Sequence, residues 1–383
     1  MFSASSSKSN RKVARGAAVA AGLLAAFTTT AATIIPASAT TLRHNVTVSE
    51  TPPKGSVNVF ETGSTLLYPL FQLWSAAYHQ EHSNIKIVPS GTGSGTGISD
   101  AADGIVDIGA SDAYLSSSQV SQHPGLLNIA LAISAQQINY NVPGLNHTHL
   151  KLTGPVISQI YQGKITEWND PAISKLNPGV NLPADKIIAL HRSDSSGDTF
   201  IFSSYLSDSD PNGWGQNIGY GTSIGFPSIS NALGETGNGG MVTGCAATPG
   251  CIAYIGISYL GKTQADGLGE AMLANKAGKF ELPTATTISA EAAALEKKTP
   301  ANETLSMVYD SAAGGYPIVN YEYAIIPPKE LNNAHAQAVK AFLAWAVDPK
   351  HGSSSSFLNQ VDFQPLTPAV AQLSLAQIAK ISG

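Results

Sequence analysis

Short apolar runs alternate with longer amphipathic stretches along the chain from Val57 onward. Short runs rich in Val and Ile predict strands, and apolar positions spaced three or four residues apart predict helices. The predicted strands are 56–60, 85–89, 105–110 and 187–190, and the predicted helices are 67–80, 98–102, 157–169, 199–206 and 334–347. This alternation predicts an α/β protein in which helices flank the sheets.

Residues 207–251 break the pattern, because they are polar and rich in Gly and Pro. Such composition predicts an irregular surface region. The region ends with Cys245 and Cys251, the only two cysteines of the chain. In an exported protein two such cysteines are expected to form a local disulfide. They are a poor metal site, because zinc takes four ligands.

The N-terminus has the three parts of a cleavable signal peptide: a basic segment, a short apolar run and an A-x-A site. These parts are Lys8 to Arg15, Gly16 to Phe27, and Ala37-Ser38-Ala39. The apolar run is shorter than the ~20 residues that cross a bilayer. We therefore expect residues 1–39 to be removed and the protein to be secreted. Residues 40–55 are expected to form a flexible mature N-terminus, and the signal region has no cysteine to carry a lipid.

Composition limits the possible partners. The chain has 383 residues, 43% hydrophobic and 12% charged, with a formal net charge of −5. This length is ample for two domains, and the charged fraction is about half the usual ~25%. A slightly acidic protein argues against a nucleic-acid partner. An anion site would have to depend on local geometry, because the protein has no global positive field.

The strongest functional signal is a recurring loop. Three times a predicted strand leads into Gly with Ser or Thr and then into a predicted helix: ETGSTL (61–66), SGTGSGTG (90–97) and RSDSSGDT (192–199). A helix N-terminus has four unpaired N–H groups and a partial positive charge, which suit an anion. N-capping explains any one such loop. Three of them predict one shared site for a tetrahedral oxyanion.

Two charged residues refine this prediction. Arg192 ends a predicted strand beside the third loop and could bind an oxyanion with two hydrogen bonds; the alternative is a surface ion pair with Asp194. Asp112 follows a predicted strand, where a carboxylate would repel an anion unless that anion carries a proton for it to accept. Phosphate near neutral pH keeps a proton and sulfate does not, so Asp112 favours phosphate.

These motifs together resemble the PstS family of phosphate-binding proteins of phosphate ABC importers. The resemblance rests on ETGSTLLYP, GTGSGTGI, IVDIGASDAYLS, LHRSDSSGDTF and YQGKITEWNDPAISKLNPG, and on NGGMVTGCA and GCIAYIGISYL, which are similar to the actinobacterial branch. It implies that phosphate is bound by Ser64, Thr65, Leu66, Ser94, Asp112, Arg192, Ser196, Gly197 and Asp198, with Asp194 orienting Arg192. It implies neither a metal nor another cofactor.

The resemblance also implies a type II periplasmic-binding-protein-like α/β fold with the ligand in the cleft between two lobes. The first lobe would combine 56–136 with 319–383, and the second would be 137–318. Hinges are expected near 137–140 and 316–318. The implied partners are phosphate and the membrane permease subunits of the importer, and the protein is expected to be a monomer.

Two departures from the family pattern stand out. Many relatives have threonine at the position of Asp198, whose side chain could accept a second phosphate proton or leave the contact to its backbone N–H. Many relatives of this branch are lipoproteins, whereas this chain has no lipobox cysteine, which leaves its retention at the membrane open.

An enzyme is the alternative from another class, namely a secreted phosphatase. Ser94 lies in TGSGT and not in G-x-S-x-G, so the nucleophile signature of a hydrolase is missing. His191 is the only histidine near the third loop, and a strand-end surface position explains it. We therefore expect a binding protein without catalytic residues.

Overall fold

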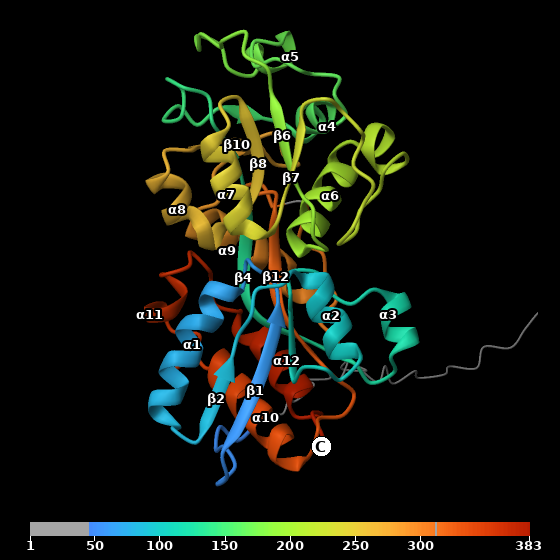
Figure 1. Cartoon of the computed structure of the whole chain (residues 1–383), viewed down its shortest axis with the longest axis vertical. Coiled ribbons are helices and arrows are strands. Elements are labelled where there is room, and N and C mark those ends of the chain that lie inside the picture. Colours follow the sequence, from blue (N-terminus) through green and yellow to red (C-terminus); the bar gives the residue numbers. More distant parts are fainter. Residues whose placement is uncertain (1–45, 311) are drawn as a thin grey trace, which may run out of the picture. The chain divides into compact units, whose positions relative to one another are not determined.

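The computed structural model describes residues 46–310 and 312–383. The predicted signal peptide, residues 1–39, lies outside the described residues. The predicted α/β class is confirmed, and the described chain has the two-lobed type II arrangement (Figure 1). Among the described residues, no helix combines the length and the apolarity needed to cross a membrane.

The main sheet runs through both lobes in the order β2-β1-β3-β12-β4-β8-β6-β7, and β9 pairs with β4. Parallel pairs lie toward both ends of this order, and the antiparallel pairs join β3, β12, β4 and β8. The strands are β1 (Val57–Gly63), β2 (Ile85–Val88), β3 (Ile108–Ser111), β4 (Leu127–Tyr140), β6 (Ile188–Arg192), β7 (Ala232–Glu235), β8 (Cys251–Gly256), β9 (Gly269–Glu270) and β12 (Val319–Ile326). A second, three-stranded sheet contains β5 (Lys151–Leu152), β10 (Met272–Ala274) and β11 (Phe280–Glu281).

Strand β4 belongs to both lobes. Its residues from Leu127 to Ala135 pair with β12, and its residues from Gln136 to Tyr140 pair with β8. All fourteen residues except Leu127 are buried. The strand therefore changes partner between Ala135 and Gln136 without a break, and this change links the β1–β3 side of the sheet to the β6–β8 side.

Helices pack against both sides of the sheet. Figure 1 shows α1, α2 and α10 beside β1–β3, and α6 and α7 beside β6–β8. The helices are α1 (Tyr68–Glu81), α2 (Ser94–Ala102), α3 (Ser117–Gln122), α4 (Gly154–Tyr161), α5 (Pro171–Ser174), α6 (Gly197–Ser209), α7 (Gly237–Ala247), α8 (Leu260–Ala265), α9 (Ala285–Leu295), α10 (Asn333–Val347), α11 (Ser355–Leu358) and α12 (Pro368–Ile378). Short π or 3₁₀ turns cover Pro211–Gly215, Ile257–Tyr259 and Glu296–Lys298.

Most predicted elements are present, but several of their ends differ from the prediction; β1 extends to Gly63 and α6 covers Gly197–Ser209. Helix α2 begins at Ser94 and not at Ile98, so the second half of the glycine loop is helical. The helix predicted over 157–169 is α4, which starts earlier and stops at Tyr161; Gly163, with φ +69°, then turns the chain away. Strand β3 begins at Ile108, three residues later than predicted.

The prediction of an irregular region over 207–251 is wrong in part. It contains β7 and the eleven-residue helix α7. Helix α7 packs on β8, which buries Met241, Val242 and Cys245. The predicted disulfide is present and joins Cys245 in α7 to Cys251 at the start of β8. Tertiary packing therefore stabilises a glycine-rich helix that local propensity disfavours.

Candidate functional site

The three glycine loops lie at the carboxyl ends of β1, β2 and β6, where α/β folds bind ligands. The first loop depends on Gly63, whose φ is +142° and whose position would bring a Cβ within 2.0 Å of the Ala110 carbonyl oxygen. This close approach turns Ser64 inward. The Ser64 hydroxyl oxygen accepts the backbone N–H groups of Leu66 (3.0 Å) and Leu67 (2.9 Å).

The second loop and β3 place two further polar groups beside Ser64. Both Ser64 and Ser94 donate their hydroxyl protons to Asp112, Ser94 at 3.2 Å. The backbone N–H of Asp112 in turn donates to the Ser94 oxygen at 3.2 Å. All three side chains are buried. Loops one and two are therefore joined through one carboxylate.

The third loop is built around Arg192, the last residue of β6. Its Nε donates to Asp194 at 2.7 Å and its Nη2 to the other oxygen of Asp194. Its Nη1 donates to Asp198 at 2.7 Å. Ser196 caps α6 by accepting the N–H of Thr199 at 3.4 Å. Three of the five guanidinium N–H groups are thus engaged, and the geometry of Arg192 is fixed from two sides.

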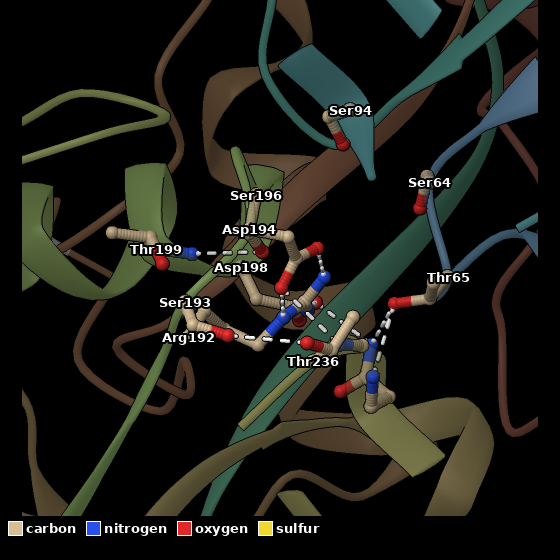
Figure 2. Close-up of polar contacts among 12 residues, drawn as sticks. Ser64, Thr65, Ser94, Arg192, Ser193, Asp194, Ser196, Asp198, Thr199 and Thr236 are labelled. Atoms are coloured by element: carbon tan, nitrogen blue, oxygen red, sulfur yellow. Dashed lines mark hydrogen bonds and ion pairs between the residues drawn. The ribbon is translucent and has the colours of Figure 1, made fainter. Parts of the chain in front are cut away.

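The loops of the two lobes meet at this site, where Thr65 of the first loop lies beside the residues around Arg192 (Figure 2). The N–H of Gly95 donates to the carbonyl oxygen of Ser195 at 3.0 Å. Gly197 lies so close to Asp112 and Ser94 that a Cβ would come within 2.4 Å of an Asp112 carboxylate oxygen. The structure therefore brings together Ser64, Thr65, Leu66, Ser94, Asp112, Arg192, Asp194, Ser196, Gly197 and Asp198. All of them are buried except Thr65 and Asp194, which are partly exposed.

Asn238, at the start of α7, was missed in the sequence analysis. Its side-chain amide donates to Thr65 (3.0 Å) and to Asp198 (2.7 Å), and its carbonyl oxygen accepts the N–H of Gly256 (2.7 Å). A single buried amide thus connects the first loop to the third. The signal was present in the motif NGGMVTGCA, but the glycines around Asn238 led to the prediction of an irregular region.

The side chain of Asp198 is fully engaged within the protein. One carboxylate oxygen accepts from Arg192 and Asn238, and the other accepts from Gln136 at 3.2 Å. Gln136 also donates to the Asp198 carbonyl oxygen at 3.0 Å. Gln136 lies on β4 and was likewise not predicted. The Asp198 carboxylate therefore orients Arg192, which leaves its backbone N–H at the start of α6 for a ligand.

Burial dominates the electrostatics of the cluster. Burial, and next the negative charge of Asp198, raises the pKa of Asp112 to about 7, against hydrogen bonds from Glu322 and Ser64 and the charge of Arg192. Burial would also raise the pKa of Asp194, but the hydrogen bonds and charge of Arg192 outweigh it and lower that pKa. The arginine is thus paired with an ionised carboxylate, whereas Asp112 titrates near neutral pH.

Metal-binding geometry occurs elsewhere in the chain. Among the described residues, His, Cys, Asp and Glu side chains gather closely enough to hold a metal only at Glu50, Asp348 and His351. There the Nδ1 atom of His351 lies 3.0 Å from a carboxylate oxygen of Glu50. This group includes none of the loop residues.

A family model and curated relatives of this chain point to the same protein family. A family model described as the PBP superfamily domain matches residues 38–350. The phosphate-binding protein PstS of Xylella fastidiosa (strain Temecula1) is 32% identical over 324 residues, which are 84% of this chain and 85% of that protein. The protein of the same name from Methanocaldococcus jannaschii is 34% identical, over 75% of this chain and 77% of that protein. The chain belongs to the PstS family of phosphate-binding proteins.

Solved structures support the fold of this PstS-family chain. A phosphate-binding protein from Stenotrophomonas maltophilia has a TM-score of 0.62 at 19% identity, covering 84% of this chain and 94% of that one. A high-affinity periplasmic phosphate-binding protein (PfluDING) has a TM-score of 0.65 at 20% identity, covering 84% and 93%. At this identity the likeness is one of fold.

Proposed function

We propose that the chain binds inorganic phosphate outside the cytoplasmic membrane and delivers it to an ABC-type importer. The observation that carries this proposal is the convergence of three helix-terminus loops on Asp112 and Arg192. Backbone N–H groups, hydroxyls and one guanidinium suit a compact tetrahedral oxyanion. The names of the family members fit this chemistry.

The proposed ligand groups are those predicted from the sequence. They are the hydroxyls of Ser64, Thr65, Ser94 and Ser196, the backbone N–H groups of Leu66, Gly197 and Asp198, the guanidinium of Arg192 and the carboxylate of Asp112. Asp194 orients Arg192. The Asp198 side chain also orients Arg192, because its two oxygens are occupied by Arg192, Asn238 and Gln136.

Asp112 is proposed to distinguish phosphate from sulfate. Its carboxylate already accepts two hydroxyl donors, and no basic side chain forms a salt bridge with it among the described residues. Ionised Asp112 can accept a proton that the ligand carries, which phosphate supplies and sulfate does not. Sulfate at the same place would leave two anions in contact, with no shared proton.

The lobes are proposed to be 56–136 with 319–383, and 137–318, with hinges near 137–140 and 316–318. The change of partner along β4 between Ala135 and Gln136 supports this division, since β12 begins at Val319. Opening at these hinges would separate loops one and two from loop three, and closure would enclose the ligand. The closed form would be the one that the permease subunits recognise.

The direct test is whether the purified mature chain carries phosphate. Native mass spectrometry should detect one bound phosphate, and calorimetry on phosphate-stripped protein should give one site with much weaker sulfate binding. A protein that binds neither ion, or both equally, would refute the proposal. Assaying release of phosphate from a generic phosphate ester in the same preparation tests the phosphatase alternative.

A further inference from the structure

Glu322 has a buried carboxyl group next to the proposed ligand site and is not one of the proposed ligand-binding residues. It lies on β12, between β3 and β4 in the sheet, and its side chain has no exposed surface. Strand β12 pairs with β3 so that Tyr323 lies opposite Ser111, which places Glu322 beside Asp112, and the Asn320 amide reaches both residues. The two carboxyl groups interact through a hydrogen bond.

The remaining contacts of Glu322 are uneven. Its Oε1 accepts the hydroxyl of Ser134 at 2.5 Å and the amide of Asn320 at 2.9 Å. Its Oε2 accepts no donor from the described residues. The Asn320 amide also approaches the Asp112 carbonyl oxygen at 3.4 Å. Oε1 therefore accepts two hydrogen bonds, whereas Oε2 can form a hydrogen bond with a neighbouring acceptor only if it carries a proton.

The hydrogen bonds around Glu322 and Asp112 require that one of these two carboxyl groups is protonated. Two ionised carboxylates accept hydrogen bonds only, so a bond between Glu322 and Asp112 requires a proton on one of them. The Ser134 hydroxyl has a single proton, yet it contacts both Glu322 and the Asn320 carbonyl oxygen (2.9 Å). The cluster is short of hydrogen atoms unless one carboxyl is protonated.

The surrounding charges indicate which carboxyl holds that proton. Glu322 forms no salt bridge among the described residues, and the nearest cation of the site, Arg192, is engaged by Asp194 and Asp198. Asp112 receives two serine hydroxyls and the favourable charge of Arg192, which stabilise its ionised form. Burial, and next the charge and hydrogen bond of Asp112, raises the pKa of Glu322 well above its ordinary value.

We propose that Glu322 is a positioning residue that stays protonated and donates its O–H to Asp112, which favours the ionised form of Asp112 as the acceptor of the ligand's proton. The proposal rests on the phosphate-binding function proposed above. No covalent bond forms or breaks, and the proton stays on Glu322 when phosphate binds. Without this donor Asp112 would protonate more readily, and a protonated carboxyl can donate to sulfate.

Three variants separate this role from simple packing. Glu322→Gln keeps an uncharged group with an N–H donor and a carbonyl acceptor, whereas Glu322→Ala removes the donor. Glu330→Gln is the matched control, because Glu330 is also buried and shares a hydrogen bond with a carboxyl, Asp107, outside the site. Thermal unfolding confirms that each variant is folded.

The measurement is the ratio of sulfate to phosphate dissociation constants by calorimetry, at pH about 6 and about 8. Wild type, Glu322→Gln and Glu330→Gln should agree closely at both values. Glu322→Ala should lose about tenfold or more of its preference for phosphate, as expected for a donor to a charged group. This loss should be larger at the lower pH, where Asp112 protonates.

Two results would overturn the proposal. One is that Glu322→Ala has the same ratio of sulfate to phosphate dissociation constants as the wild type at both pH values. The other is a phosphate affinity of Glu322→Gln that differs from wild type by more than about tenfold, which would mean that wild-type Glu322 is ionised. If Glu322→Ala does not fold, the infrared difference between wild type and Glu322→Gln decides. It should contain the carbonyl band of a protonated carboxylic acid, and absence of this band refutes the proposal.

The two proposals fail separately. A wild-type protein that binds no phosphate refutes the proposed function. A wild-type protein that binds phosphate and rejects sulfate, with Glu322 variants that do the same at both pH values, leaves the function intact and refutes only the role of Glu322.

Discussion

The hydroxyl of Thr65 accepts two hydrogen bonds from Asn238, one from its backbone N–H (3.1 Å) and one from its side-chain amide (3.0 Å). The two residues are 173 positions apart in the sequence. Thr65 follows β1, whereas Asn238 lies in α7, which packs on β8. Because the same amide also reaches Asp198, Asn238 connects the first and third loops.

Asn238→Ala should therefore weaken phosphate binding by about tenfold or more, since buried partners left without hydrogen bonds cost about 1–3 kcal/mol. Thr65, Asp198 and the N–H of Gly256 would each lose a partner. Calorimetry measures the affinity. Asn146→Ala is the control, because Asn146 bonds Val142 and Gly267 away from the site. Equal losses in both variants would contradict a specific role for Asn238.

Asp112→Asn should narrow the preference for phosphate over sulfate. An amide can donate to sulfate, which the carboxylate cannot do, and it repels neither ion. The ratio of the two dissociation constants checks this. Asp107→Asn, which alters a buried aspartate bonded to the N–H of Phe60, should leave the ratio unchanged. Unchanged discrimination in Asp112→Asn would remove the proposed proton-accepting role.

Arg192→Ala should weaken phosphate binding by clearly more than the ~1 kcal/mol of an exposed ion pair. The Arg192 side chain is 1% exposed, and its removal leaves the Asp194 and Asp198 carboxylates without their cation. Lys262→Ala breaks an exposed pair with Asp266 and serves as the control. A dissociation constant of Arg192→Ala within a few fold of wild type would exclude a central position for this arginine.

Removing the disulfide should lower the free energy of unfolding by about 2–3 kcal/mol, the chain-entropy value for a very short loop. The double variant Cys245→Ser with Cys251→Ser tests this in urea unfolding, and the wild-type protein in reductant should behave alike. Because α7 carries Asn238 and is held to β8 by this bond, phosphate affinity should also fall slightly. Equal unfolding midpoints with and without reductant would contradict the prediction.

The stability of phosphate-free protein should fall as the pH rises from about 4 to about 7, by at most about 1.4 kcal/mol per pH unit for each group. The pKa of Asp112 is raised to about 7, so the folded state holds a proton that the unfolded state has already released. The contribution of Asp112 to the free energy of unfolding is complete below its pKa in the unfolded chain. It is lost as the pH rises through its pKa in the folded protein. Urea unfolding at several pH values measures the slope, which should be smaller in Asp112→Asn. A stability that rises over this range would contradict the assignment.

The parts of the site that follow strands could be predicted from the sequence, because local chemistry specifies them. Gly63-Ser64 and Ser196-Gly197 combine a tight turn with a helix start, and both are read from neighbouring residues alone. The ends of α2 and α4 were less predictable. Glycines in 93–97 conceal the start of α2, and the single Gly163 ends α4.

The residues that were missed act over long separations. Asn238 lies in a segment with poor helix propensity, which becomes helical because α7 packs on β8. Glu322 is surrounded by apolar strand residues, and its partners Asp112 and Ser134 are about two hundred positions away. No local sequence pattern predicts a contact between residues so far apart in the chain, because the order of the strands in the sheet brings them together.

The position of β12 also has a consequence for how the protein is made. This strand completes the sheet between β3 and β4, yet it comes from residues 319–326. Strands β1 to β4 are therefore synthesised long before the partner that joins them, and the ribosome must reach the last sixth of the chain before that lobe can assemble. The sheet of that lobe therefore depends on a long-range pairing that forms only once most of the chain has been synthesised.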